Sequence, residues 1–165
     1  IPNLRLKMIN GKYAKLHDFL KDGPMIIDFW ATWCEPCKKQ MKYLNIFNNH
    51  FKKTGFKVLA VNTDTPKSMS KVKSYVRTKK FEFEVAVDPN SQIKKKMKVL
   101  QMPTTILVDQ SGEIIFRHQG YLPGDEHDIL KEIYDLLDKT EVSYEKLDLN
   151  KDNNKQIKTG ADVDF

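Results

Sequence analysis

Residues 28–38 read Asp28-Phe29-Trp30-Ala31-Thr32-Trp33-Cys34-Glu35-Pro36-Cys37-Lys38. The first of these residues end a short, nearly continuous apolar run over residues 25–30, which predicts a strand covered on both faces. Pro36 then opens a helix, because the fixed φ of proline suits a first helical turn. Two cysteines separated by two residues therefore lie where a strand passes into a helix.

These two cysteines are the only ones in the chain, and their spacing favours redox chemistry. A disulfide across so short a loop adds little stability by loop closure. Zinc would require further ligands, and the nearest histidine, His50, lies well beyond Cys37. A c-type haem site would need histidine at the position of Lys38. We therefore expect no metal and no cofactor other than a redox-active Cys34–Cys37 disulfide.

The start of a helix suits the thiolate that thiol–disulfide exchange requires. Unpaired backbone N–H groups and the positive end of the helix dipole favour a thiolate at the N-cap, where Cys34 is expected. Cys37, one turn further in, is placed to attack a mixed disulfide formed by Cys34. Cys34 is thus the expected attacking cysteine and Cys37 the resolving one.

Outward from this stretch, the hydrophobic pattern alternates between strands and helices. Asn10-Gly11 between two apolar stretches signals a hairpin, and Gly55 is expected to end the helix that begins at Pro36. Further strands are predicted at 58–61, 84–87, 104–108 and 114–117, and further helices at about 68–79, 92–97 and 125–137. This order predicts an α/β domain over residues 1–140 with a mixed sheet, followed by a polar tail or linker over 141–165.

The formal net charge is +6, from 28 Lys and Arg against 22 Asp and Glu. Aromatic side chains do not interleave with the lysine clusters and no nucleic-acid motif accompanies them, so we expect no nucleic-acid partner. No apolar run approaches the length of a membrane-spanning helix. The chain begins at Ile1-Pro2, which we interpret as a mature form or an excised domain whose targeting or anchoring segment lies outside this sequence.

The stretch 28–38 closely resembles the active-site signature of the thioredoxin superfamily, and its Trp-Cys-Glu-Pro-Cys core resembles the TlpA/ResA-type branch. Met102-Pro103-Thr104-Thr105 is placed like the cis-proline loop of that family, and residues 63–97 like the helix and strand that the branch inserts. The resemblance covers roughly residues 1–140. It implies a thioredoxin fold: a three-layer α/β/α sandwich with a central mixed sheet, an N-terminal β-hairpin and a TlpA-type βα insertion.

The resemblance also implies a client-binding surface. Pro103 would be cis and lie against the disulfide, so that a client chain pairs with the backbone of Met102. From the sequence alone, Pro103 is a proline before a strand, and most such prolines are trans. Trp33 and Pro36 would contribute to the surface beside Cys34, and Trp30 would help to cover it, although large aromatic residues more often serve packing.

Two acids are placed like functional acids of the family. Asp28 matches the buried acid that assists proton transfer to and from the resolving cysteine; the alternative is a frayed strand with a solvated Asp28. TlpA/ResA-type proteins commonly have Asn here. Thioredoxins place a lysine nearby where this chain has Ala60, so desolvation should raise the pKa of Asp28 further. Glu35 would tune the cysteines toward a reductant, although an acid is favourable in a first helical turn anyway.

By resemblance, the expected function is reduction of disulfides in extracytoplasmic client proteins, such as apocytochrome c, by a periplasmic monomer. An upstream thiol electron donor, such as a membrane thiol–disulfide reductase, would regenerate it. An oxidase or isomerase of folding proteins is an alternative, because residue types do not determine the reduction potential. A non-catalytic thioredoxin-fold binding module is another, but it would need neither sulfur. Peroxide reduction is not expected, because peroxiredoxins place their cysteine in a Thr-x-x-Cys context.

Overall fold

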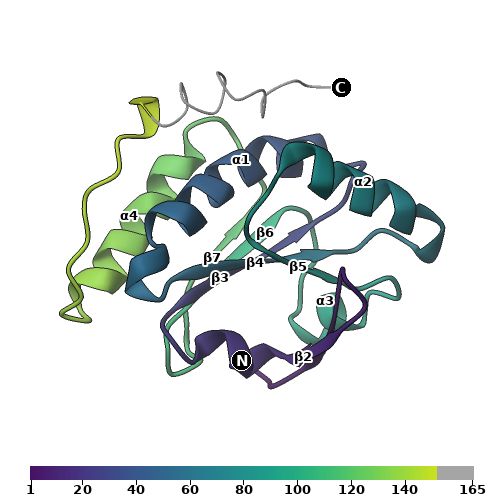
Figure 1. Ribbon diagram of the computed structural model, residues 1–165, viewed down its shortest axis with the longest axis horizontal. Coiled ribbons are helices and arrows are strands. Elements are labelled where there is room, and N and C mark those ends of the chain that lie inside the picture. Colours follow the sequence, from purple (N-terminus) through teal and green to yellow (C-terminus); the bar gives the residue numbers. More distant parts are fainter. Residues whose placement is uncertain (152–165) are drawn as a thin grey trace.

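A mixed sheet of seven strands runs through the computed structural model, which describes residues 1–151 (Figure 1). Its strand order is β2-β1-β5-β4-β3-β6-β7. The strands are β1 (Arg5–Met8), β2 (Tyr13–Lys15), β3 (Met25–Trp30), β4 (Lys57–Asn62), β5 (Glu84–Val87), β6 (Thr104–Val108) and β7 (Ile114–Gln119). The helices are α1 (Glu35–His50), α2 (Met69–Lys79), α3 (Gln92–Lys96) and α4 (Asp125–Asp138), with 3-10 turns η1 (Leu16–Leu20), η2 (Lys52–Thr54) and η3 (Pro66–Ser68).

Helices cover the sheet on both faces. Side chains of α1, α2 and α4 share one core with one face of the sheet, and η1 and α3 pack on the opposite face (Figure 1). β3, β4 and β5 are parallel, whereas the β1–β2 hairpin and the β6–β7 pair are antiparallel additions at the two edges. The expected three-layer thioredoxin fold with an N-terminal hairpin is therefore confirmed, and α2 and β5 lie in the segment 63–97 expected to be an insertion.

β3 lies in the middle of the sheet, and all six of its residues are buried. Because side chains alternate along a strand, Ile26, Asp28 and Trp30 point toward α1, while Ile27 and Phe29 point to the other face. The prediction of a doubly covered strand is thus confirmed. The same register buries one carboxyl group, that of Asp28, beneath the helix that carries the cysteines.

The end of α1 differs from the expectation that Gly55 terminates it. α1 ends at His50, and the chain continues into η2, which Gly55 caps with a φ of 88°. Glycine is required there for a second reason as well. A Cβ on Gly55 would lie 1.9 Å from the carbonyl oxygen of Asp22, because the two backbones cross closely.

The segment after α4 also differs from the expected polar tail as far as the structure describes it. Leu147 and Leu149 are buried in the core shared by α1 and α4. The hydroxyl of Tyr134 on α4 accepts a hydrogen bond from the backbone N–H of Leu147 at 2.8 Å. Residues 141–151 therefore pack along the domain; the remainder of the expected tail, 152–165, lies outside the described residues.

Candidate active site

The two cysteines form a disulfide at the start of α1, with their Cα atoms 5.3 Å apart. Cys34 is the N-cap, and its Sγ accepts a hydrogen bond from the backbone N–H of Cys37 at 3.3 Å. Pro36 stands in the first turn, as predicted, and its ring is exposed beside them. Cys34 retains 5% exposure and Cys37 none, so Cys34 is the sulfur that a client can reach.

A buried carboxylate holds the loop that leads to Cys34. Asp64, two residues beyond β4, accepts hydrogen bonds from the backbone N–H of Thr32 at 2.8 Å and from its hydroxyl at 2.6 Å. The side-chain amide of Asn62 also donates to Asp64, at 2.7 Å. The sequence analysis did not find these residues; an Asn-x-Asp pattern at the end of a buried strand was the available signal.

The loop before β6 lies beside the loop before α1. The Met102–Pro103 peptide bond is cis, which confirms the expected isomer. The hydroxyl of Thr63 donates to the sulfur of Met102 at 2.9 Å and to the backbone carbonyl of Trp30 at 3.3 Å, so one residue contacts the loop before β6 and the end of β3, from which the chain enters the loop before α1. Pro103 is buried and Met102 is partly exposed.

Asp28 is fully buried, and burial raises its pKa to about 8. Its Cα partners are Ala60 on β4 and Thr105 on β6, so the position beside it on β4 carries a methyl group rather than a cation. Hydrogen bonds donated by Thr105 and Gln40 oppose the effect of burial but do not overcome it. The expectation of a buried acid dominated by desolvation is confirmed, and a frayed, solvated strand is excluded.

The remaining predicted residues divide between surface and core. Trp33 is 67% exposed beside Cys34, whereas Trp30 is completely buried, so Trp30 cannot cover the active-site surface as expected. The carboxylate of Glu35 points to the surface, where it accepts a hydrogen bond from the Lys38 ammonium at 3.3 Å. The lysine was not anticipated as the partner of this acid.

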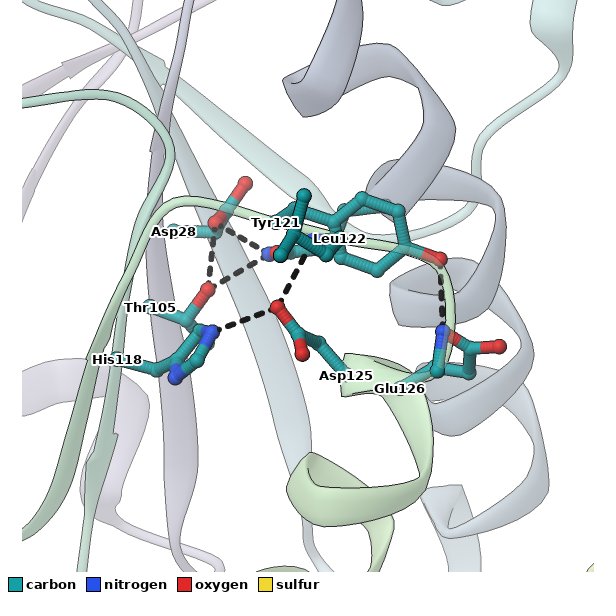
Figure 2. Close-up of polar contacts among 9 residues, drawn as sticks. Asp28, Thr105, His118, Tyr121, Leu122, Asp125 and Glu126 are labelled. Atoms are coloured by element: carbon teal, nitrogen blue, oxygen red, sulfur yellow. Dashed lines mark hydrogen bonds and ion pairs between the residues drawn. The ribbon is translucent and has the colours of Figure 1, made fainter.

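Polar contacts at the start of α4 hold the loop that follows β7 (Figure 2). Asp125 accepts a hydrogen bond from the backbone N–H of Leu122 at 2.8 Å, which lowers the pKa of that carboxyl, and contacts His118 at 2.9 Å. Glu126 accepts a bond from the hydroxyl of Tyr121 at 2.7 Å. Within residues 1–151, no group of three or more His, Cys, Asp and Glu side chains is arranged to hold a metal ion.

Comparisons with known proteins agree with this geometry. A model of the AhpC/TSA family matches residues 1–117. The chain is 34% identical over 119 residues to the thiol-disulfide oxidoreductase ResA of Bacillus thuringiensis subsp. konkukian, covering 72% of this chain and 67% of that protein. It is 35% identical over 114 residues to ResA of Bacillus subtilis, covering 69% and 62%. A crystal structure assigned as the thiol:disulfide interchange protein DsbE from Chlorobium tepidum superposes with a TM-score of 0.76 at 32% identity, covering 82% of this chain and 94% of the other.

Proposed function

Because the chain belongs to the AhpC/TSA family and is related to the ResA thiol-disulfide oxidoreductases, we propose that it reduces disulfides in client proteins outside the cytoplasm. The chain is a thiol–disulfide oxidoreductase of the thioredoxin fold, and its substrates contain disulfides. The matched segments span about two thirds of the length of these curated relatives. The Cys34–Cys37 disulfide at the start of α1 carries the proposal.

Cys34 performs the attack in this mechanism. In the reduced protein, the backbone N–H of Cys37 and the helix dipole stabilise the Cys34 thiolate, which lies at the N-cap. This thiolate attacks one sulfur of a client disulfide, forms a mixed disulfide and releases the other client sulfur as a thiolate, which takes a proton from water. Trp33, Pro36 and the loop at Met102 and Pro103 provide the surface on which the client lies.

Cys37 completes the reaction. It transfers its thiol proton to the ionised carboxylate of Asp28, and its thiolate attacks the sulfur of Cys34 in the mixed disulfide. The second client sulfur leaves with the electron pair of the broken S–S bond and takes a proton from water. The client disulfide has then gained two electrons and become two thiols, and the protein holds the Cys34–Cys37 disulfide seen in the structure. An upstream dithiol donor, itself oxidised to a disulfide, returns the electrons.

The same proposal includes the direction of electron transfer, the compartment in which the protein acts and its oligomeric state. The similarity to ResA and DsbE supports a reductant that works outside the cytoplasm, with apocytochrome c as one client class. No helix within residues 1–151 is long and apolar enough to cross a membrane. The Glu35 carboxylate near Cys34 disfavours the thiolate and so favours a reducing centre. We expect the reaction to be performed by a monomer.

The reduction potential of the Cys34–Cys37 pair, measured by equilibration with glutathione, tests the direction. We expect a value near or below about −250 mV, as for a reductant. A value of about −120 to −180 mV would instead assign the protein as an oxidase or isomerase. Cys34→Ser is the control and should show no redox transition. Absence of any exchange by the wild-type protein would leave a binding module as the remaining function.

A further inference from the structure

A closed set of hydrogen bonds surrounds one oxygen of Asp28 (Figure 2). Oδ1 of Asp28 accepts a bond from the side-chain amide of Gln40 at 3.0 Å and another from the hydroxyl of Thr105 at 3.1 Å. The same amide nitrogen of Gln40 donates to the hydroxyl of Thr105 at 2.6 Å. The two amide hydrogens and the hydroxyl hydrogen are therefore all used, and the three side chains are all fully buried.

The two outer oxygens of this set have no partner among the described residues. They are Oδ2 of Asp28 and the side-chain carbonyl oxygen of Gln40. Because two donors already occupy Oδ1, the proton of a neutral Asp28 belongs on Oδ2. An unpaired polar atom at such depth is costly and calls for an explanation, and a role in the chemistry is one such explanation.

Cys37 is a buried titratable group on the same side of α1 as Gln40, which contacts Asp28. It lies three residues before Gln40 on the same buried face, one turn closer to the helix start. β4 contributes Ala60 beside Asp28, and β6 contributes Thr105. Beyond Thr105, β7 places His118 as its Cα partner, and the imidazole of His118 contacts Asp125 of α4 rather than Asp28 (Figure 2). Burial, Thr105 and Gln40 therefore control when Asp28 ionises.

We propose that Gln40 and Thr105 are positioning residues of the redox reaction, which bind Oδ1 of Asp28 and so leave Oδ2 as the oxygen that exchanges a proton with the Cys37 thiol. This inference rests on the proposed function. In the resolving step, the proton of the Cys37 S–H bond passes to Oδ2 of the ionised Asp28, and the sulfur keeps the electron pair with which it attacks Cys34. When an upstream donor reduces the disulfide, Oδ2 returns the same proton to the departing Cys37 sulfur.

The pH dependence of the resolving step tests this assignment. Reduced protein is mixed with a client disulfide, and formation and decay of the mixed disulfide are followed separately between about pH 5 and about pH 10. In the wild type, the decay rate should rise with pH as Asp28 ionises, with a midpoint near pH 8. Both hydrogen bonds lower the pKa of Asp28, so removal of either should move this midpoint to higher pH.

Thr105→Val removes the hydroxyl while keeping the shape of the side chain. It should raise the midpoint of the decay step by about 1 pH unit, because a hydrogen bond to a charged group is lost. Thr105→Ser keeps the hydroxyl and should restore the wild-type midpoint. Gln40→Met supplies a second variant with the same expected shift. Formation of the mixed disulfide depends on Cys34 and should be unchanged in all three, which shows that each variant is folded at the active site.

The outcomes separate the proposals. Wild-type midpoints in both Thr105→Val and Gln40→Met would overturn the positioning role while leaving the oxidoreductase intact. A wild-type profile in Asp28→Asn would overturn it as well, since Asp28 would then not accept the proton. A wild-type protein that forms no mixed disulfide at all would overturn the proposed function itself. A shift in both variants, with rescue by Thr105→Ser, supports the inference, because a purely structural defect would not move the midpoint of one step alone.

Discussion

Asp64 accepts two hydrogen bonds from Thr32, one from its backbone N–H at 2.8 Å and one from its hydroxyl at 2.6 Å. Thr32 stands two residues before Cys34, and Asp64 lies two residues beyond the end of β4. The pair therefore ties the neighbouring parallel strand to the loop that places the attacking sulfur. Bidentate contacts to a buried carboxylate restrict both the position and the orientation of a loop, so this contact positions Cys34 without touching it.

Asp64→Ala should destabilise the oxidised protein by about 3 kcal/mol, because it leaves the N–H of Thr32 and the amide of Asn62 buried without acceptors. Urea unfolding of the oxidised form measures this loss. Asp128→Asn is the matched control, since Asp128 is exposed on α4, and it should change the free energy of unfolding by no more than about 0.5 kcal/mol. Equal losses in the two variants would show that the Asp64 contact does not stabilise the loop.

The raised pKa of Asp28 should make the protein less stable as pH rises. Between about pH 4 and about pH 8, the unfolded chain releases the Asp28 proton while the folded chain keeps it, so the unfolded state binds fewer protons and the free energy of unfolding falls. The effect of this group is complete once pH exceeds the folded pKa of about 8.

Asp28→Asn should therefore gain about 5 kcal/mol relative to the wild type between pH 4 and pH 8.5, as the wild type alone loses stability through this group. Urea unfolding at a series of pH values gives the difference, in which the contributions of the other acids cancel. Asp128→Asn should follow the wild-type curve. If the curves of Asp28→Asn and the wild type run parallel, Asp28 does not titrate with a raised pKa.

Trp33 and Trp30 offer the same side chain in opposite environments. Trp33→Ala should raise the KM for a protein disulfide such as that of insulin by about tenfold and leave stability unchanged, because its ring is exposed beside Cys34, where we propose that clients bind, and does not pack in the core. Trp30→Ala should instead cost about 3 to 5 kcal/mol of stability. Steady-state kinetics and thermal unfolding distinguish the two. A KM for Trp33→Ala equal to that of the wild type would remove Trp33 from the client surface.

Local sequence patterns predicted the strands and helices, but they did not predict the contacts between residues that are far apart in the sequence. β3 and the start of α1 could be predicted because the apolar run, the proline and the two cysteines that indicate them lie close together in the sequence. The bond between Gln40 and Thr105 joins residues 65 positions apart, and that between Thr32 and Asp64 joins residues 32 apart. Polar side chains such as these are mostly exposed in proteins, so only the fold shows that they are buried together.

The packing of the segment after α4 escaped prediction for a related reason. Its two buried leucines, Leu147 and Leu149, stand among charged residues, and no periodic pattern distinguishes them. Two apolar positions suffice here because aromatic rings already stand where the segment passes: Tyr144 stacks on Tyr134 of α4 with ring centroids 5.6 Å apart, and it makes a T-shaped contact with Phe51, the residue after α1. The helices determine the path of this segment more than its own composition does.

Leu147→Ala should consequently lower the free energy of unfolding by about 2 kcal/mol, since it removes a buried side chain from the core shared by α1 and α4. Val142→Ala is the control in the same segment, because Val142 is 38% exposed and its truncation should cost less than about 0.5 kcal/mol. Both variants should keep the reduction potential of the wild type, as both residues lie in the segment after α4, whereas the disulfide lies at the start of α1. Guanidinium unfolding and glutathione equilibration measure the two properties on the same samples. A loss in Leu147→Ala no greater than that in Val142→Ala would mean that residues 141–151 lie on the domain without stabilising it.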